Sequence, residues 1–395
     1  MSRSQWEQAD LKAQCATIDN KTGVPHFWFQ QTGSEGERVD VLVVRATFDF
    51  GFGGAVMKLA QNQQAIVLGD LFDGVKESEV MRAVVVDDGD LLPYKPGTDV
   101  IVTGSASAPD GIAAREWTVG IRVGMLKKVL RLHGPRQFRK HLLGWRLGTA
   151  QPVTTVALDY RLAYGGCIDI PPELTEDGDP DTVKHEGNPA GCGWLPGSAA
   201  YAHLPKRARA YVRETIGRIK ELPAPQIEDP LQAVSSPYAG LLPQGFSAIA
   251  RWWEPRVSLQ GTYDAAWRAT RYPLLPKEFD FRYFQCASAG LVATPHLKGD
   301  ETVTLLGLLP ERRDMTLPGW RIIAVATHAS GEITVSLPLL DTLRFDLARE
   351  EASMVWRIHY NDDDPVVDVA IAATTQLIVR KGMAVGNAGA TKGAL

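Results

Sequence analysis

The stretch LLPYKPGTDVIVTGSASAP, residues 91–109, decides the fold class of this chain. Each of its first two prolines fixes φ and pushes the preceding residue toward extended backbone. Valine then alternates with isoleucine and threonine over residues 100–103, which predicts a strand with one buried face. Gly104 and the small residues after it allow another backbone to come close. The stretch therefore predicts entry into a sheet, and it matches neither the phosphate-loop nor the nucleophile-elbow pattern.

Strand patterns of the same kind recur along the chain. Residues 39–50 form a β-branched run typical of a buried strand, and the strict alternation over residues 116–123 predicts a half-buried one. Residues 126–132 repeat the alternation after Gly124, which predicts a hairpin. Further short strands are predicted over residues 64–71, 79–86, 153–160, 302–308, 320–327, 332–337, 354–360, 366–372 and 376–380. Short strands separated by Gly, Pro and Asp indicate antiparallel sheets rather than a βαβ array.

One long helix is predicted over residues 206–222, where an apolar stripe has helical spacing and Pro223 follows. Arginine and lysine cover its other face, which we interpret as a solvated surface. The chain is therefore predicted to be mainly β, with antiparallel sandwich- or barrel-like sheets, a loop-rich middle and one or two helices. We expect a polar leader over 1–22, a β-rich part over 23–160, a loop-rich aromatic part over 161–290, a β-rich part over 291–380 and a flexible tail over 381–395.

The composition excludes several classes of protein. With 45% hydrophobic and 22% charged residues, the 395-residue chain has an ordinary globular composition, and its net charge of -4 gives no electrostatic footprint for nucleic acid. Its first residues contain no apolar signal segment, and no run approaches the roughly 18 apolar residues of a membrane span. We therefore expect a cytoplasmic protein with neither nucleic acid nor a membrane as a partner. Its four cysteines are too few and too scattered for a disulfide framework.

No local signature of a catalytic or zinc site occurs in the sequence. It has no HExxH motif, and the spacings of its Cys and His residues match no zinc finger or ribbon. On the residues alone, an interaction protein and a hydrolase-like enzyme with a dispersed site both stay open. In such an enzyme, Asp264 or Asp280 would act as acid or base with His185 beside it. A carbohydrate-binding β-sandwich is a third alternative, which would need exposed coplanar tryptophans.

Residues 245–284 concentrate aromatic and charged side chains. Aromatic residues at this density form either a recognition surface or a seal over a core beneath loops, and we favour the seal. Charged residues that are buried in such a region should form pairs that fix the irregular backbone. The aromatic residues are Trp252, Trp253, Trp267, Phe279, Phe281 and Phe284, and the charged ones are Arg256, Asp264, Asp280 and Arg282.

A series of motifs in a fixed order carries a resemblance to a known family. The segment PYKPGTD…GxAxAP, residues 93–109, contains Lys95 and Asp99 and comes first. It is followed by Tyr160…Tyr164-Gly165-Gly166, Asn188-Pro189…Gly191…Gly193, Ile227-Glu228…Pro230, Gly245-Phe246…Trp253…Pro255-Arg256, Gly261-Thr262-Tyr263-Asp264…Trp267, Pro273-Leu274-Leu275-Pro276…Phe279-Asp280, Leu340-Asp341-Thr342 and Trp356-Arg357. Together these motifs resemble a bacterial family catalogued as a domain of unknown function, family 2169, and associated with type VI secretion.

Three positions depart from the family's pattern. Arg161 stands where the pattern has Glu, Ser247 where it has Gly, and Gln226 where it has Asn. No role is therefore carried over to these positions. The basic helix predicted from Lys206 occupies a region that the family varies, which suggests that this member fits a partner of its own.

The resemblance implies an adaptor or chaperone rather than an enzyme. Members of the family are typically encoded beside spike-tip proteins of the PAAR type or the VgrG trimer and their toxic effectors, and help to load that cargo onto the spike. The implied partners are a type VI effector with a PAAR-type tip and the VgrG spike protein, and no catalytic residue, cofactor or metal is implied. We expect strand addition to a partly folded client as the mode of binding. The partner-binding or motif-structural candidates are Lys95, Asp99, Trp253, Arg256, Tyr263, Asp264, Trp267 and Asp280.

Overall fold

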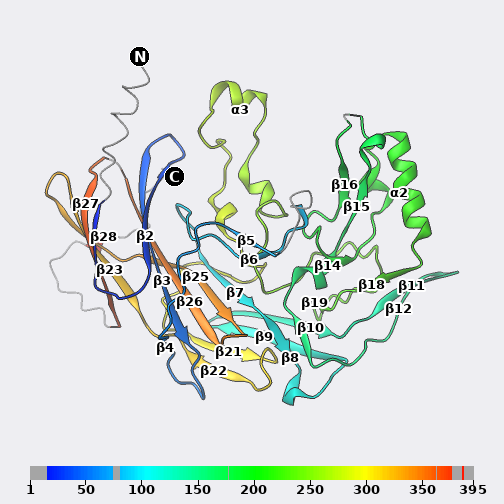
Figure 1. Cartoon of the computed structure of the whole chain (residues 1–395), viewed down its shortest axis with the longest axis horizontal. Coiled ribbons are helices and arrows are strands. Elements are labelled where there is room, and N and C mark those ends of the chain that lie inside the picture. Colours follow the sequence, from blue (N-terminus) through cyan, green and yellow to red (C-terminus); the bar gives the residue numbers. More distant parts are fainter. Residues whose placement is uncertain (1–15, 74–80, 177, 362, 376–384, 387–395) are drawn as a thin grey trace.

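The computed structural model describes residues 16–73, 81–176, 178–361, 363–375 and 385–386. These residues form several open sheets arranged along the longest axis, and two α-helices at the edge of the molecule (Figure 1). None of the sheets that these residues form closes into a barrel, and the predicted mainly β fold is confirmed. Within the described ranges, no helix is long and apolar enough to cross a membrane.

The largest sheet joins segments from both ends of the sequence. Its hydrogen-bonded order is β2-β3-β26-β25-β7-β20, with β4 beside β3. Since β26 pairs with β3 along its whole length, the N-terminal and C-terminal β-rich parts share this sheet. Its strands are β2 (His26–Thr32), β3 (Arg38–Asp49), β4 (Lys58–Leu59), β7 (Thr98–Thr103), β20 (Val292–Ala293), β25 (Leu339–Asp346) and β26 (Glu351–Asn361).

β7 is the strand predicted from the opening stretch, and both of its faces are buried. It pairs in parallel with β25 and in antiparallel orientation with β20. Val100 and Val102 point to one face and Asp99 and Ile101 to the other, and none of the four has exposed surface. The predicted strand is confirmed, but the prediction of a single buried face is wrong. The second face is buried because a cluster of paired charged residues covers it.

The second sheet contains the predicted hairpin. Its hydrogen-bonded strand order is β19-β10-β9-β21-β22. β9 and β10 pair in antiparallel orientation, with Val123 opposite Leu126 at the turn and Glu116 opposite His133 at the far end, which confirms the hairpin. Directly after Gly104, β8 pairs with β13 in antiparallel orientation, so another backbone does approach the small residues that follow Gly104, as predicted. The strands are β8 (Ser105–Ser107), β9 (Glu116–Val123), β10 (Leu126–His133), β13 (Thr155–Ala157), β19 (Ile227–Glu228), β21 (Thr302–Leu306) and β22 (Arg313–Thr316).

A third sheet is built from the ends of the chain, in the order β1-β27-β23-β24-β28. Three of its strands lie where the C-terminal pattern predicted them. The segment predicted as a strand over 376–380 lies outside the described residues. The strands are β1 (Thr17–Asn20), β23 (Arg321–His328), β24 (Ile333–Ser336), β27 (Val366–Thr374) and β28 (Val385–Gly386).

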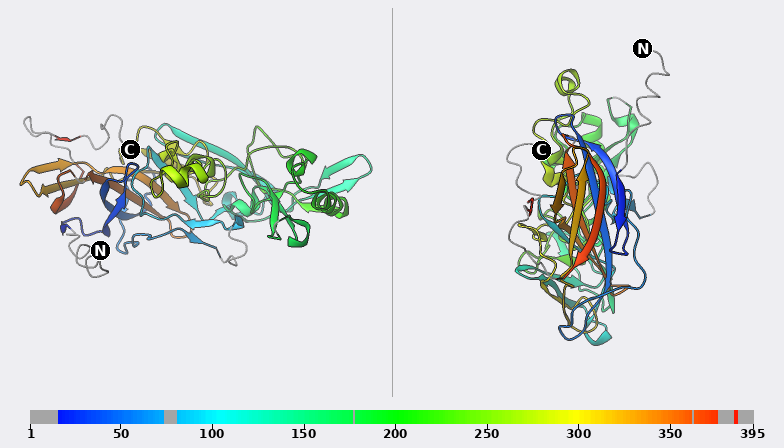
Figure 2. Two further views of the ribbon diagram at one scale, coloured as in Figure 1. Left: turned by 90° about the horizontal axis from the view of Figure 1, so that it is seen from above. Right: turned by 90° about the vertical axis from the view of Figure 1, so that its left-hand side faces the viewer.

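The far end of the molecule carries the long helix and a three-stranded sheet (Figure 2). The helix α2 (Lys206–Arg218) begins where predicted but ends before Leu222. It ends early because β18 (Glu221–Pro223) pairs with β11 (Gln137–His141), whose other neighbour is β12 (Gly144–Leu147). Ala208 and Val212 bury the helix against a small core under β15 (Cys167–Ile170) and β16 (Asp181–Lys184).

Two of the predicted strands are largely absent from the described residues. In place of the strand predicted over 64–71, the structure has only the two-residue strand β5 (Leu71–Phe72), and in place of the one predicted over 79–86 it has β6 (Val85–Asp87). Residues 79 and 80 lie outside the described ranges. Within residues 64–71, the backbone is held by side chains instead of a ladder: the N–H of Val67 donates to Asp90. The remaining elements are β14 (Tyr164–Gly165), β17 (Cys192–Gly193), α3 (Ala265–Thr270) and short 3-10 helices at Pro109–Gly111, Tyr160–Leu162, Pro172–Leu174, Ser198–Tyr201, Val257–Gln260 and Phe281–Phe284.

Candidate functional site: a buried charge cluster and a projecting arm

Lys95 is buried beside β7, and its ammonium group has three polar partners. Its Nζ lies 2.9 Å from the carboxylate of Asp99 and 3.3 Å from that of Asp88. It also donates a hydrogen bond of 2.9 Å to Oγ1 of Thr342 on β25. A buried ammonium is tolerated only when it is paired, and here each of its three donors has an acceptor.

Asp99 connects β7 to a segment far along the chain. Its carboxylate accepts hydrogen bonds from the backbone N–H of Cys286 at 2.9 Å and of Ala287 at 3.3 Å. In the sheet it stands opposite Thr342, the residue that also binds Lys95. Asp99 therefore holds three separate segments together: the turn at Lys95, β25, and the chain at Cys286.

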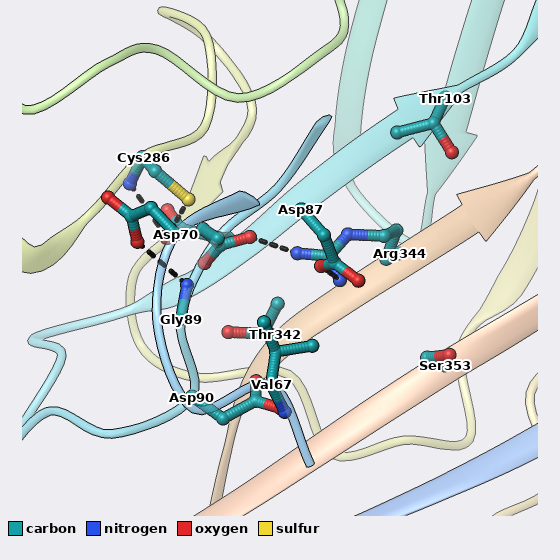
Figure 3. Close-up of polar contacts among 12 residues, drawn as sticks. Val67, Asp70, Asp87, Gly89, Asp90, Thr103, Cys286, Thr342, Arg344 and Ser353 are labelled. Carbon is teal, nitrogen blue, oxygen red and sulfur yellow. Dashed lines mark hydrogen bonds and ion pairs between the residues drawn. The ribbon is translucent and has the colours of Figure 1, made fainter. Parts of the chain in front are cut away.

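Arginine–aspartate pairs extend this arrangement along the same face of the sheet. Arg344, a residue of β25, pairs with both Asp87 and Asp88, and Figure 3 shows its guanidinium beside Asp87. Figure 3 also shows Asp70 accepting from the N–H of Gly89, which fixes the loop that carries these carboxylates. We name the whole group the charge cluster; its members are Arg45, Asp87, Asp88, Asp90, Lys95, Asp99, Asp341, Arg344 and Arg357.

Within the charge cluster, the pKa shifts of Lys95 and Asp88 favour their charged forms, whereas burial raises the pKa of Asp90 and lowers that of Arg344 to about 9. Burial by itself would lower the pKa of Lys95, but the nearby carboxylates, Asp99 foremost, raise it well above its usual value. Burial would raise the pKa of Asp88, but Lys95 lowers it. Burial raises the pKa of the Cys286 thiol well above its usual range. The ion pair of Lys95 and Asp99 therefore acts as a structural clamp beside β7.

Trp253 and Arg256, two further candidates, also lie in the interior. Trp253 has no exposed surface; its indole N–H donates to the carbonyl of Met81, and its ring meets that of Tyr160 edge to face at 5.7 Å. Arg256 is buried and donates to the backbone carbonyl of Ile249 at 2.6 Å. It also donates to that of Tyr283 at 2.9 Å. Both residues hold the loop-rich middle against the core.

The other motif residues form a projection that we call the arm, residues 261–280, with α3 at its end (Figure 1). Asp264 caps α3 by accepting a hydrogen bond of 2.8 Å from the N–H of Trp267. The ring of Trp267 is flanked by Tyr263 at 4.7 Å and Tyr272 at 5.6 Å, both edge to face. Its indole N–H donates to the carbonyl of Leu274. Since α3 has no buried residue, these contacts around Trp267 hold the arm in shape.

Arg271 fastens the arm to the turn between β2 and β3. Its guanidinium donates to the carbonyl of Ser34 at 2.9 Å and pairs with Glu35 at 2.8 Å. The arm also carries an open hollow of about 460 Å³. The hollow is lined by Thr262, Asp264, Ala266, Trp267, Thr270, Arg271, Pro276, Lys277 and Glu278. Tyr263 and Tyr272 stay 47% and 68% exposed, so the arm carries an accessible aromatic surface.

The residues proposed for a dispersed catalytic site have separate structural partners. Asp280 caps the 3-10 helix at Phe281–Phe284 and pairs with Arg282, which lowers the pKa of Asp280. Of the four charged residues that were expected to form ion pairs, Asp280 and Arg282 therefore pair with each other. Arg256 instead donates to backbone carbonyls, and Asp264 is exposed and caps α3. His185 lies against Tyr164 and Trp194, and its Nε2 donates to the carbonyl of Leu241 at 3.0 Å.

The aromatic residues of the middle divide between the two roles foreseen for them. Trp253 seals the core, and Phe279, Phe281 and Phe284 are half-buried and contact one another in edge-to-face or tilted arrangements, with ring centres 5.3–6.1 Å apart. Trp267 instead organises the arm. Every tryptophan in the described part of the chain is buried or half-buried.

The chain matches a known protein family over most of its length. A family model described as "Uncharacterized protein conserved in bacteria (DUF2169)" matches residues 35–357. This range contains the charge cluster and the whole arm. No curated protein and no solved structure matches the chain.

Proposed function

The chain belongs to the bacterial family DUF2169, and from this premise we propose that it is a non-catalytic adaptor or chaperone for another protein. The client is a type VI secretion effector or its PAAR-type tip protein, and the adaptor helps to load it onto the VgrG spike. The link to type VI secretion comes from the resemblance of the motifs. The preference for protein binding comes from the division of those motifs between a buried clamp and an exposed arm.

The arm is the observation that carries the proposal. The motif residues Asp264 and Trp267 cap and pack the arm, and Arg271 fastens it to the β2–β3 turn, although the helix α3 has no buried residue. What this leaves accessible is the pair Tyr263 and Tyr272. Tyrosine is enriched in protein interfaces because it offers a large apolar area with a polar end at little cost in conformational entropy.

A second feature beside the arm suits an extended client. β2 is the outer strand of the largest sheet, and among the described residues its only strand partner is β3. Phe27 and Phe29 stack at 6.3 Å on one of its faces, while Trp28 packs into the core against Tyr360. Strand addition at β2 would supply backbone hydrogen bonds, and the arm above the β2–β3 turn would supply side-chain selectivity.

The test is a co-purification of the tagged protein with the effector, PAAR-type and VgrG proteins encoded beside its gene. We expect the wild type to retain an effector or PAAR-type protein. The variant Tyr263→Ala/Tyr272→Ala should retain at least about tenfold less of that protein. Tyr238→Ala is the matched control, since Tyr238 is also 47% exposed but lies outside the arm.

Two outcomes would overturn the proposal. One is the absence of any bound spike or effector protein, and the other is turnover of a substrate that depends on Asp264 or Asp280. If binding persists in the tyrosine variant but is lost when Phe27 and Phe29 are replaced by serine, the client-binding surface is the β2 edge and not the arm.

A further inference from the structure

The hairpin of β11 and β12 ends in two leucines that are in solvent. Leu142 and Leu143 form its two-residue turn, with exposed fractions of 105% and 93%. Turns of this length usually contain Asn, Asp or Gly, which tolerate both tight backbone and water. The left-handed backbone here is taken by Gly144, with φ of 118°. Two large apolar side chains at this turn therefore add nothing to its packing and keep apolar surface in water.

Basic residues surround this tip. Arg139, Lys140 and Arg146 are exposed on the hairpin itself, and residues 137–147 contain no acidic residue. The hairpin is joined through β18 to α2, and the N–H of Lys140 donates to the carbonyl of Lys220. Residues 206–221 contain six Lys or Arg and two Glu, whereas the whole chain has 42 basic and 46 acidic residues. Basic residues thus outnumber acidic ones on the hairpin and on α2, where Arg139 pairs with Glu221. Residues 169–181, whose strands pack against α2, contain six acidic residues and no basic one, so the positive charge is confined to the hairpin and the helix.

The hairpin also stands at an extremity of the protein. In the view from above in Figure 2, β11 and β12 form the right-hand end of the longest axis, with α2 beside them. Trp145 lies behind the tip, half-buried, with the ammonium of Lys140 5.9 Å from its ring centre. The hairpin therefore presents the apolar side chains of Leu142 and Leu143 at its tip, and the ring of Trp145 with nearby basic groups behind them.

We propose that this hairpin tip docks on the surface of an anionic lipid bilayer. Leu142 and Leu143 enter the headgroup region, and the basic side chains of the hairpin and α2 face the lipid phosphates. Exposed apolar groups next to Lys and Arg are the combination that binds proteins to anionic bilayers without a spanning segment. The expectation that no membrane is a partner rested on the search for spanning segments, which this contact does not require. The proposal is independent of the adaptor role.

A bilayer suits the tip better than an acidic protein does. Specific protein interfaces bury more than about 1,000 Å² with close shape complementarity, and a convex turn of two residues offers far less. A bilayer needs no complementary pocket, and its surface charge acts on all nearby basic residues at once.

The experiment is co-sedimentation of the full chain with vesicles of phosphatidylglycerol and phosphatidylethanolamine, and with vesicles of phosphatidylcholine alone. We expect binding to the anionic vesicles that falls when salt is raised from about 0.1 M to about 1 M. Leu142→Ser/Leu143→Ser should reduce the bound fraction at least about tenfold, because two apolar side chains no longer leave water. Leu231→Ser is the matched control, since Leu231 is 90% exposed elsewhere and its replacement should leave binding unchanged. Lys140→Gln/Arg146→Gln should weaken binding and flatten its salt dependence.

Each other outcome overturns the proposal. These are no sedimentation with anionic vesicles, equal sedimentation with both kinds of vesicle, and equal sedimentation of the wild type and the leucine variant. Capture of an acidic protein by a photo-cross-linker placed at Leu143, without vesicle binding, would assign the tip to a protein partner instead. The leucine variant should keep the wild-type melting temperature, because both side chains are outside the core.

Discussion

Replacing Lys95 by methionine tests whether the charge cluster holds the sheet together. Methionine keeps most of the aliphatic stem, so the change mainly removes the charge and the contacts to Asp99, Asp88 and Thr342. Removing one partner of a buried ion pair costs about 3–5 kcal/mol, because the other charge stays buried. Asp99 keeps its two backbone donors and Asp88 keeps Arg344, so we expect a loss near the lower end, about 3 kcal/mol.

The assay is equilibrium unfolding in urea, followed by tryptophan fluorescence, for the wild type, Lys95→Met, Asp99→Asn and the double variant. If the two charges stabilise each other, the double variant should lose less than the sum of the single losses by at least about 1 kcal/mol. Lys58→Met, at an exposed position on β4, is the control and should stay within about 0.5 kcal/mol of the wild type. A loss below about 1 kcal/mol for Lys95→Met, or single losses that simply add, would refute the reasoning.

Three further outcomes follow from the same contacts. Asp264→Ala removes the cap of α3 and should cost about 1 kcal/mol locally, seen as faster amide hydrogen exchange at Trp267 with an unchanged urea midpoint; faster exchange in β3 would contradict it. Trp253→Ala opens the core and should cost about 3–5 kcal/mol, whereas a loss under about 1 kcal/mol would show that the site collapses without penalty. Because the pKa of Asp88 is lowered in the fold, its contribution to stability is present above the unfolded pKa and is lost as pH falls through the folded pKa. Unfolding free energy measured from pH 7 to about pH 2 should therefore fall less steeply in Asp88→Asn, and an identical slope would refute this.

Part of the candidate site could be predicted from the sequence. Lys95 and Asp99 were singled out, and so were Asp264 and Trp267. Their motifs drew attention to the right residues without saying which were buried. Lys95 and Trp253 lie in the interior and Tyr263 is on the arm, and no local pattern separates these cases, because burial depends on segments that come from elsewhere in the chain.

The strand β25 shows most clearly what local sequence could not reveal. Residues 339–346, LLDTLRFD, place charges inside an apolar run, so alternation predicts no buried strand there. The structure buries Asp341 and Arg344 because each meets an opposite charge, Asp341 with Arg357 and Arg344 with Asp88. The partner of Arg344 lies 256 positions away in the chain. The sequence did contain a signal, since Asp341 and Arg344 stand three positions apart within an apolar, strand-like run. That signal could be interpreted only once the structure showed their partners, Arg357 and Asp88.

The sequence by itself determined that the protein is built from sheets, where β9, β10 and α2 begin, where β3 lies to within one residue, and that the β9–β10 segment is a hairpin. These features follow from the period of apolar residues and from nearby Gly and Pro, which act within a few residues of chain. Only the tertiary structure decided that β7 is buried on both faces, that the charge cluster forms, and that the Trp267 motif projects as an arm. Those outcomes depend on electrostatic and packing contacts between distant segments, and such contacts exist only once the chain has folded.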